Sequence, residues 1–419
     1  MTGFTPRPYR LYNKIQYYGW GTKNEKAIIP HLLGIEPEHD KPYAELWIGA
    51  HPKASSEIEI DGNRVTLDRV VKELPTESLG EFVCGKFGGR FPFLLKVLSA
   101  ARALSIQAHP NKDQAVKLHA ARPDLYVDDN HKPEIAIAID SLDAIVGFRP
   151  VREVQSNVRS LPGLSSFVGR ETVDDVSRAS DDHDLAEHIK TLYSEIMTRS
   201  ENVERLSDCI KDIENRLSQL TARTPEESEF LRQYESYGID VGLLSLFFFN
   251  MVHLEPGQAI FTDAGVPHAY LKGNIVECMA NSDNVVRAGL TNKFKDVGTL
   301  LEILKYDFQK CEILNSSRQK GDVTYKTKAE EFEVSHHVKV GGSYETWTTN
   351  RSPYVVLVLD GTVEVNWTEG GAEESIAFSK GDSFFVPAFL SEFRLKFRDN
   401  ADFFSVTVPR GDNQHERKN

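Results

Sequence analysis

The sequence predicts a mainly β protein built from two antiparallel barrels, with a helical segment inserted into the first. Short apolar stretches cut by Gly, Pro and Asp occupy residues 1 to about 150 and return after residue 241, as expected of β-strands. Between residues 152 and 237 the charge rises and apolar residues recur at helical spacing. A degenerate repeat links the two β regions, which indicates two barrels of related design.

The first β region contains two strongly apolar strands. Phe91 to Leu98 and Ile135 to Ile139 are apolar stretches of the kind found in mostly buried strands. After residue 241, turns at Leu254 to Gly257 and at Asp263 to His268 separate further strands, as in an antiparallel barrel.

The charged segment between the β regions predicts packed helices. One apolar seam advances by three and four residues through Val203, Leu206, Ile210, Ile213, Leu217 and Leu220. This seam is shorter than three heptads, which favours a helical insert over a coiled-coil partner helix. Thr224 is a helix N-cap, Pro225 suits the first helical position and Glu227 the third, so we expect a new helix that ends at Tyr237-Gly238.

The second β region, from about residue 320 to 410, carries a turn and a repeat. Tyr354 to Leu359, the turn Asp360-Gly361 and the alternating Thr362 to Val365 predict a hairpin. The stretch Lys380 to Ala388 repeats the pattern of Pro256 to His268 but ends in alanine where the earlier copy has histidine. We therefore expect only the first barrel to retain a ligand.

These patterns divide the chain into a first barrel of residues 1–151 together with 238–310, a helical insert of residues 152–237 and a second barrel of residues 311–410. The polar residues 411–419 are expected to be a disordered tail.

Composition narrows the class of protein. The 419 residues are 40% hydrophobic and 26% charged, as in a globular protein with a buried core. Lys and Arg number 49 against 62 Asp and Glu, a net charge of −13 with no basic block, so we expect no nucleic-acid partner. Any bound anion must lie in a local basic pocket.

Location and redox state follow from apolar runs and cysteines. The longest apolar run, Val241 to Val252, is interrupted by Ser245 and Asn250 and is shorter than the ~18 to 20 residues of a membrane span. The N-terminus lacks a secretory pattern, so we expect a cytoplasmic protein with no membrane contact, and a monomer. No CxxC pair occurs among the four cysteines, so any metal is expected to bind nitrogen and oxygen.

Three distant segments carry candidate metal ligands. Gln107 and His109 follow one another at the two-residue spacing that places side chains on one face of a strand. Glu134 begins an apolar strand, where a carboxylate is costly to bury without a cation, and His268 follows the turn Gly265-Val266-Pro267. Taken alone, each of these residues also fits a structural role as a hydrogen-bonded polar side chain. Together they suit a borderline divalent metal such as zinc, with open positions for water or substrate.

The segment after His268 is rich in charge. Glu277, Asp283, Arg287 and Lys293 lie within one turn-rich stretch. They fit either a solvated loop or, beside a metal, a set of acid, base and anion-binding groups.

Several motifs together resemble one enzyme family. The segments Tyr126 to Glu134 and His268 to Lys293 are similar to those of type I phosphomannose isomerases. So are Glu45 to Pro52, Tyr18 to Gly21 and Gln107 to Pro110. The resemblance extends over nearly the whole chain, with one departure: Asn292 stands where the family has proline before Lys293.

This resemblance implies a cupin-type, jelly-roll catalytic barrel with one zinc ion held by Gln107, His109, Glu134 and His268. The implied activity interconverts D-mannose 6-phosphate and D-fructose 6-phosphate. It would supply mannose 6-phosphate for GDP-mannose synthesis and glycosylation, and allow mannose catabolism. The family's active-site arginine, lysine and aspartate fall on Arg287, Lys132 and Asp283.

Aldose–ketose isomerisation moves a proton between C2 and C1 through a cis-enediol whose oxygens gain negative charge. We expect Arg287 to stabilise that charge, Lys132 to carry the proton and Asp283 to help open the sugar ring, with Glu277 and Tyr270 as competing candidates.

For the phosphate we expect contacts from Ser105, Lys96 and Lys293, with Trp20 lining the pocket. Lys96 would alternatively pair with a buried acid, and Trp20 would alternatively pack in the core.

Two alternatives remain open from the sequence. A non-enzymatic cupin that binds a metal or sugar would keep the ligands without needing the surrounding charges. An Fe(II) oxygenase would use two histidines and one carboxylate, but would not need Gln107 as a fourth ligand.

Overall fold

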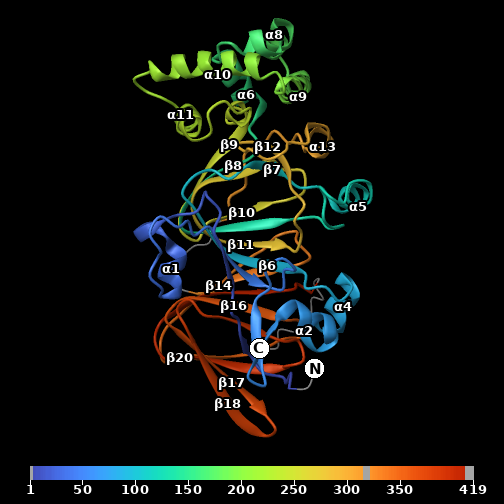
Figure 1. Ribbon diagram of the computed structural model, residues 1–419, viewed down its shortest axis with the longest axis vertical. Helices are drawn as coiled ribbons and strands as arrows, with labels where there is room; N and C mark the ends of the chain where they lie inside the picture. The colour runs from blue at the N-terminus through green and yellow to red at the C-terminus, as the bar shows by residue number, and fades with distance from the viewer. Residues whose placement is uncertain (1–2, 315–320, 411–419) are drawn as a thin grey trace.

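The computed structural model of the protein describes residues 3–314 and 321–410. Figure 1 shows an elongated molecule in which the helices of residues 151–237 lie at one end, the first barrel in the middle and the C-terminal strands at the other end. The predicted tail of residues 411–419 lies outside the described residues. The mainly β architecture with a helical insert is as predicted.

The first barrel is a nine-stranded antiparallel sheet whose main path runs β10-β8-β11-β6-β3-β2, with β9 paired to β8 and β7 joining β11 to β12. Its strands are β2 (Lys14–Gln16), β3 (Glu45–Gly49), β6 (Phe93–Ala100), β7 (Ile106–Ala108), β8 (Glu134–Phe148), β9 (Phe249–Leu254), β10 (Ala259–Thr262), β11 (His268–Ala280) and β12 (Val286–Gly289). The two apolar stretches of the sequence are β6 and the first part of β8, both fully buried. These long strands are the rigid frame of the barrel.

Short helices and one small hairpin flank this sheet. They are the 3-10 helix η1 (Asn24–Lys26), α1 (Ile28–Leu33), α2 (Leu67–Glu73), α3 (Pro75–Leu79), α4 (Glu81–Phe87), α5 (Lys112–Ala121), α12 (Gly242–Ser245) and α13 (Val297–Ile303), with strands β4 (Glu57–Ile60) and β5 (Asn63–Thr66). Helices α2 and α4 lie beside the C-terminal strands in Figure 1.

The insert consists of helices only. They are α6 (Val151–Arg159), α7 (Leu164–Val168), α8 (Arg170–Arg178), α9 (Asp182–Arg199), α10 (Val203–Ser218) and α11 (Pro225–Tyr237). On α10 the seam is buried from Leu206 to Leu217, whereas Val203 is exposed. Thr224 caps α11 in a capping box with Glu227, as predicted from the sequence. The seam packs inside the protein, as a helical insert requires.

The C-terminal strands form a second barrel of two sheets. A six-stranded sheet has the order β1-β19-β16-β21-β14-β13 and a four-stranded sheet the order β15-β20-β17-β18. The bounds are β1 (Tyr9–Arg10), β13 (Val323–Tyr325), β14 (Glu333–Lys339), β15 (Tyr344–Thr348), β16 (Tyr354–Asp360), β17 (Thr362–Glu369), β18 (Ala372–Ser379), β19 (Ser383–Val386), β20 (Glu392–Phe397) and β21 (Ala401–Thr407). Strand β1 therefore belongs to this sheet, although the sequence analysis placed residues 1–151 in the first barrel.

The predicted hairpin at Asp360-Gly361 is wrong. Strand β16 pairs with β19 and β21, whereas β17 pairs with β18 and β20, so this turn carries the chain from one sheet to the other. Gly361 has a φ of 76°, and a Cβ at this position would lie 1.9 Å from the carbonyl oxygen of Asn400. The glycine is needed for a sharp corner packed against another loop, a requirement that local sequence does not distinguish from a hairpin turn.

In the described ranges, no helix combines the length and apolar character that crossing a bilayer requires. All four cysteines are described, and each is a free thiol.

Candidate active site

The site is built on one face of three neighbouring strands. In the antiparallel register Gln107 of β7 lies opposite both His268 of β11 and Arg287 of β12. Residues opposite each other in paired strands project to the same face, so Arg287, Gln107 and His268 form a row. His109 projects to this face as well, because it follows Gln107 by two residues. Glu134, at the start of β8, completes the group from a fourth strand.

His109, Glu134 and His268 form a buried cluster whose nitrogen and oxygen atoms lie within 4.8 Å of one another. The Nε2 atom of His268 is 2.8 Å from Oε1 of Glu134, and Nε2 of His109 is 3.5 Å from Oε2. The side chains are at most 1% exposed. All three groups are therefore buried in the barrel.

Hydrogen bonds to the backbone set the tautomer of both imidazoles. Nδ1 of His109 lies 2.8 Å from the carbonyl oxygen of Asn284, and Nδ1 of His268 lies 3.0 Å from that of Val266. Because a carbonyl only accepts, both Nδ1 atoms carry a proton, which leaves the Nε2 atoms, the ones that face Glu134, as the atoms able to bind a metal.

A bound cation would satisfy the buried atoms of this contact that make no hydrogen bond. Nε2 of His109 and Oε2 of Glu134 have no hydrogen-bond partner within the described residues. The side chain of Gln107 adds a fourth donor, since its amide lies 3.5 Å from Nε2 of His268 and either end of an amide can face that point. Two imidazoles, a carboxylate and an amide oxygen suit zinc. The residues present therefore fit a bound metal.

Electrostatics favours the charge states that a metal needs. Burial and the nearby Lys132 lower the pKa of His109 to about 4, which keeps the ring neutral. Although burial opposes ionisation of Glu134, Lys132 and the two histidines hold its pKa well below the usual value. Nζ of Lys132 lies 3.2 Å from Oε2 of Glu134, and the hydroxyl of Tyr270 donates to Oε1 at 3.3 Å. Lys132 and Tyr270 thus adjoin the cluster.

A second buried charge group lies along β3, β6 and β11. Register places Trp47, Lys96 and Glu277 opposite one another, and Nζ of Lys96 lies 2.8 Å from Glu277 and 3.8 Å from Glu45. The indole of Trp47 donates to Glu45 at 2.5 Å. Lys96 is thus paired with buried acids, which is the alternative to phosphate binding that the sequence analysis named. Despite burial, these acids raise its pKa.

Replacing Lys96 by methionine is expected to lower the free energy of unfolding by about 3 kcal/mol, because two buried carboxylates lose their cation. Burial already raises the pKa of Glu45, and losing Lys96 raises it further. A carboxyl group whose pKa is higher in the folded than in the unfolded protein stabilises the fold only at low pH, where it is protonated. The loss in free energy of unfolding, measured by urea unfolding, should therefore be larger at about pH 8 than at about pH 5.

The matched control is Lys14→Met, which removes an exposed lysine 3.0 Å from Glu57 on the neighbouring strand β2 and should cost less than about 1 kcal/mol. Equal losses in the two variants, or a loss from Lys96→Met that does not change with pH, would show that Lys96 is not the counter-ion of the buried acids.

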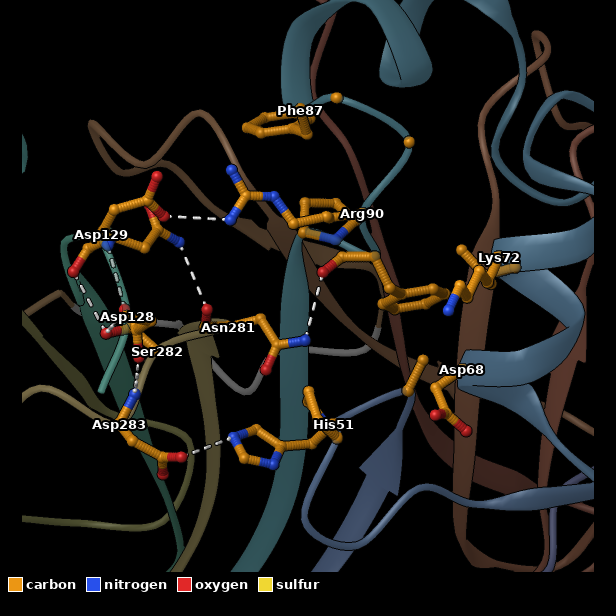
Figure 2. Close-up of a pocket in the computed structure, with 18 of the residues that line it drawn as sticks. His51, Asp68, Lys72, Phe87, Arg90, Asp128, Asp129, Asn281, Ser282 and Asp283 are labelled. Atoms are coloured by element: carbon orange, nitrogen blue, oxygen red, sulfur yellow. Dashed lines mark hydrogen bonds and ion pairs between the residues drawn. The ribbon is translucent and has the colours of Figure 1, made fainter. Parts of the chain in front are cut away.

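Asp283 belongs to a third group, at the wall of a large cavity. Its carboxylate lies 2.8 Å from Nζ of Lys53 and 3.5 Å from Nε2 of His51, as Figure 2 shows for His51. The buried His51 ring packs edge-on against Trp47, and burial lowers its pKa. Glu45, His51 and Lys53 have no role in the sequence analysis, although the resemblance included the segment that contains the first two.

The cavity beside Asp283 has a volume of about 940 Å³. It lies between the loops after β3 and β11, the helices α2 and α4, and the loop before β8 (Figure 2). None of the predicted phosphate contacts Ser105, Lys96 and Lys293 is among its lining residues, although all three are described. The cavity and the metal cluster are separate features that are linked through one loop, because Asp283 lines the cavity and the carbonyl oxygen of the next residue, Asn284, faces Nδ1 of His109.

The remaining predicted residues differ in their burial and in their contacts. Arg287 is partly buried, and its guanidinium has no ion-pair or hydrogen-bond partner in the part of the chain that the structure describes. Burial lowers its pKa. Lys293 is exposed, Ser105 directly precedes β7, and Trp20 is partly buried and stacks on Tyr18 at 5.7 Å.

Comparisons with known proteins show which sequences this chain resembles. The family model for the phosphomannose isomerase type I catalytic domain matches residues 9–151. Mannose-6-phosphate isomerase 1 of Arabidopsis thaliana is 39% identical, over 90% of this chain and 89% of its own length. The rat mannose-6-phosphate isomerase is 41% identical over 72% of this chain and 74% of its own.

Solved structures give the same relationship in three dimensions. The mannose 6-phosphate isomerase of Salmonella typhimurium, solved with fructose 6-phosphate and zinc, superposes with a TM-score of 0.83. It is 28% identical, and the match covers 96% of this chain and all of that one. Because the chain is 39% identical to the Arabidopsis isomerase over 90% of its length and shares the fold of the Salmonella enzyme, it belongs to the type I phosphomannose isomerase family.

Proposed function

We propose that the protein interconverts D-mannose 6-phosphate and D-fructose 6-phosphate, using one zinc ion held by Gln107, His109, Glu134 and His268. The observation that carries this proposal is the buried cluster of His109, Glu134 and His268, in which Nε2 of His109 and Oε2 of Glu134 have no hydrogen-bond partner within the described residues. The Arabidopsis and rat relatives bear the name of this isomerase, and the Salmonella structure contains zinc and fructose 6-phosphate.

Zinc bound here would act as a Lewis acid on the sugar oxygens at C1 and C2, stabilising the charge that develops in the cis-enediol. The residues of the chain then have distinct tasks. Lys132, beside Glu134, moves the proton between C2 and C1. Asp283, held by Lys53, assists opening of the sugar ring.

The two competing candidates have other roles in this proposal. Burial and the neighbouring acids raise the pKa of Tyr270 well above its usual value, so this hydroxyl remains a proton donor at neutral pH. Glu277 is paired with Lys96 and is better placed to orient that lysine than to remove a proton. This leaves Lys132 as the base.

Replacing Arg287 by alanine is expected to lower kcat about 10²-fold while zinc content stays unchanged, because a preorganised cation facing the developing enediolate is lost. Its guanidinium has no carboxylate partner within the described residues, so it is free for the substrate. Steady-state kinetics and metal analysis measure both quantities. The control is Arg122→Ala, since Arg122 is paired with Asp296. An unchanged kcat in Arg287→Ala would exclude this role.

We propose that Lys293 and Ser105 hold the phosphate and that Trp20 lines the sugar pocket. Lys293→Ala should raise KM for mannose 6-phosphate about tenfold, the loss expected for one charge-assisted hydrogen bond. Lys295 lies two residues away on the same loop, and Lys295→Ala is the matched control. If both variants keep the original KM, the phosphate is bound elsewhere.

The experiment that tests the function follows fructose 6-phosphate formation from mannose 6-phosphate, before chelation, after chelation and after zinc is added back. Turnover that is lost and then restored supports the isomerase. Zinc-loaded protein without turnover would favour the metal- or sugar-binding cupin. Iron in the purified protein together with oxygen consumption would favour the oxygenase.

We further propose a monomeric enzyme of the cytoplasm that binds neither membrane nor nucleic acid. Four free thiols suit a reducing compartment. Analytical ultracentrifugation measures the oligomeric state.

A further inference from the structure

Two loops beside the metal cluster are tied together by one carboxylate. Residues 127–130 precede Lys132 and Glu134, and residues 281–284 precede Arg287. Figure 2 shows Asp128 of the first loop directed at Ser282 and Asp283 of the second. Both loops also form part of the 940 Å³ cavity.

The carboxylate of Asp128 accepts four hydrogen bonds. Oδ1 accepts from the hydroxyl of Ser282 at 2.8 Å, the backbone N–H of Asn130 at 3.0 Å and the side-chain amide of Asn284 at 3.1 Å. Oδ2 accepts from the backbone N–H of Asp283 at 2.8 Å. Three of the four donors belong to the second loop, so this carboxylate sets the position of that loop.

The second loop in turn orients a ligand of the proposed metal. The side chain of Asn284 also donates to the carbonyl oxygens of Asp128 at 2.7 Å and Asn130 at 3.0 Å, and Asn284 is completely buried. The backbone carbonyl oxygen of Asn284 accepts a hydrogen bond from Nδ1 of His109 at 2.8 Å. A continuous chain of hydrogen bonds therefore leads from Asp128 to the imidazole that presents its Nε2 lone pair to the cluster.

We propose that Asp128 is a positioning residue of the metal site: it fixes the 281–284 loop so that the carbonyl of Asn284 holds His109 in the metal-binding tautomer and orientation. The same loop position supports Asp283 at the wall of the site. This inference rests on the proposed role of His109 as a zinc ligand. Hydrogen bonds that orient metal-bound histidines commonly change metal affinity 10- to 100-fold when they are lost.

The test compares two isosteric substitutions at neighbouring positions. In Asp128→Asn, the amide nitrogen replaces one acceptor oxygen and must face at least one N–H or O–H donor. At least one of the four hydrogen bonds accepted by residue 128 is therefore lost, whichever way the side chain turns. Asp129→Asn is the control, because within the described residues the carboxylate of Asp129 pairs with the exposed Arg90 and makes no hydrogen bond to the 281–284 loop. Zinc affinity is measured by competition with a chromophoric chelator, and the absorption spectrum of the cobalt-substituted protein reports ligand geometry.

We expect Asp128→Asn to weaken zinc binding about tenfold and to alter the cobalt spectrum, with Asp129→Asn indistinguishable from the unmodified protein in both. Thermal unfolding of the metal-free proteins shows whether the fold is kept. If Asp128→Asn does not fold, Ser282→Ala, which removes one donor to Oδ1, should weaken zinc binding severalfold. Unchanged zinc affinity and cobalt spectrum in the folded variant, or equal effects from Asp129→Asn, would overturn the role of Asp128. An unmodified protein that binds no zinc would instead overturn the proposed function, so the two failures are distinguishable.

Discussion

Replacing Glu134 by glutamine is expected to remove zinc from the protein and to lower isomerase turnover by at least about 10³-fold. Among the described residues, Glu134 is the one carboxylate of the buried metal cluster, and its two oxygens face the two imidazoles. The neutral amide cannot balance a divalent cation in a site that excludes water. Loss of a Lewis acid worth several kcal/mol to the transition state corresponds to this decrease, at about 1.4 kcal/mol per factor of ten.

Metal analysis and the coupled isomerase assay measure both effects. The matched control is Glu226→Gln, a buried carboxylate 3.0 Å from Arg149 in the helical insert. This control should lose stability, because Arg149 remains buried without its counter-ion, yet retain zinc and turnover. A Glu134→Gln protein that binds zinc stoichiometrically and turns over normally would refute the metal site.

Replacing Lys132 by methionine should lower kcat about 10³-fold while zinc remains bound. General base catalysis contributes about 10²- to 10⁴-fold, and methionine keeps most of the volume of the lysine stem while removing the amino group, which acts as the base in its neutral form. Lys132 lies 3.2 Å from Glu134, where its charge competes with that of a metal, so its removal should leave zinc affinity unchanged or increase it. This combination separates proton transfer from metal binding.

Incorporation of solvent deuterium at C2 of mannose 6-phosphate reports the proton-transfer step directly and should fall in parallel with turnover. Lys305→Met, which removes an exposed lysine paired with Asp263 beside the turn that carries His268, serves as the control. Exchange and turnover at the original rates in Lys132→Met would exclude Lys132 as the base. Glu277 would then be the remaining candidate for the base.

Features that depend on nearby residues were predictable from the sequence. The apolar stretches at Phe93 and Ile135 became buried strands, and Thr224 caps α11 as its neighbours indicated, because burial pattern and capping are decided within a few residues. Gln107 and His109 share a face for the same reason. The turn at Asp360-Gly361 was predictable as a turn but not as a corner between sheets, since the partners of β16 and β17 lie elsewhere in the chain.

The amino-acid sequence alone determined the kinds of group available to the site and their local direction: two imidazoles, a carboxylate and an amide at the beginnings and ends of strands. The tertiary structure decided which of the charges meet. Register across β3, β6 and β11 pairs Lys96 with Glu277 and brings Glu45 and Trp47 beside it, and the loops from β3 and β11 join His51 and Lys53 to Asp283. Such contacts join residues up to about 230 positions apart, and their energies depend on distance and burial, which exist only once the strands have paired.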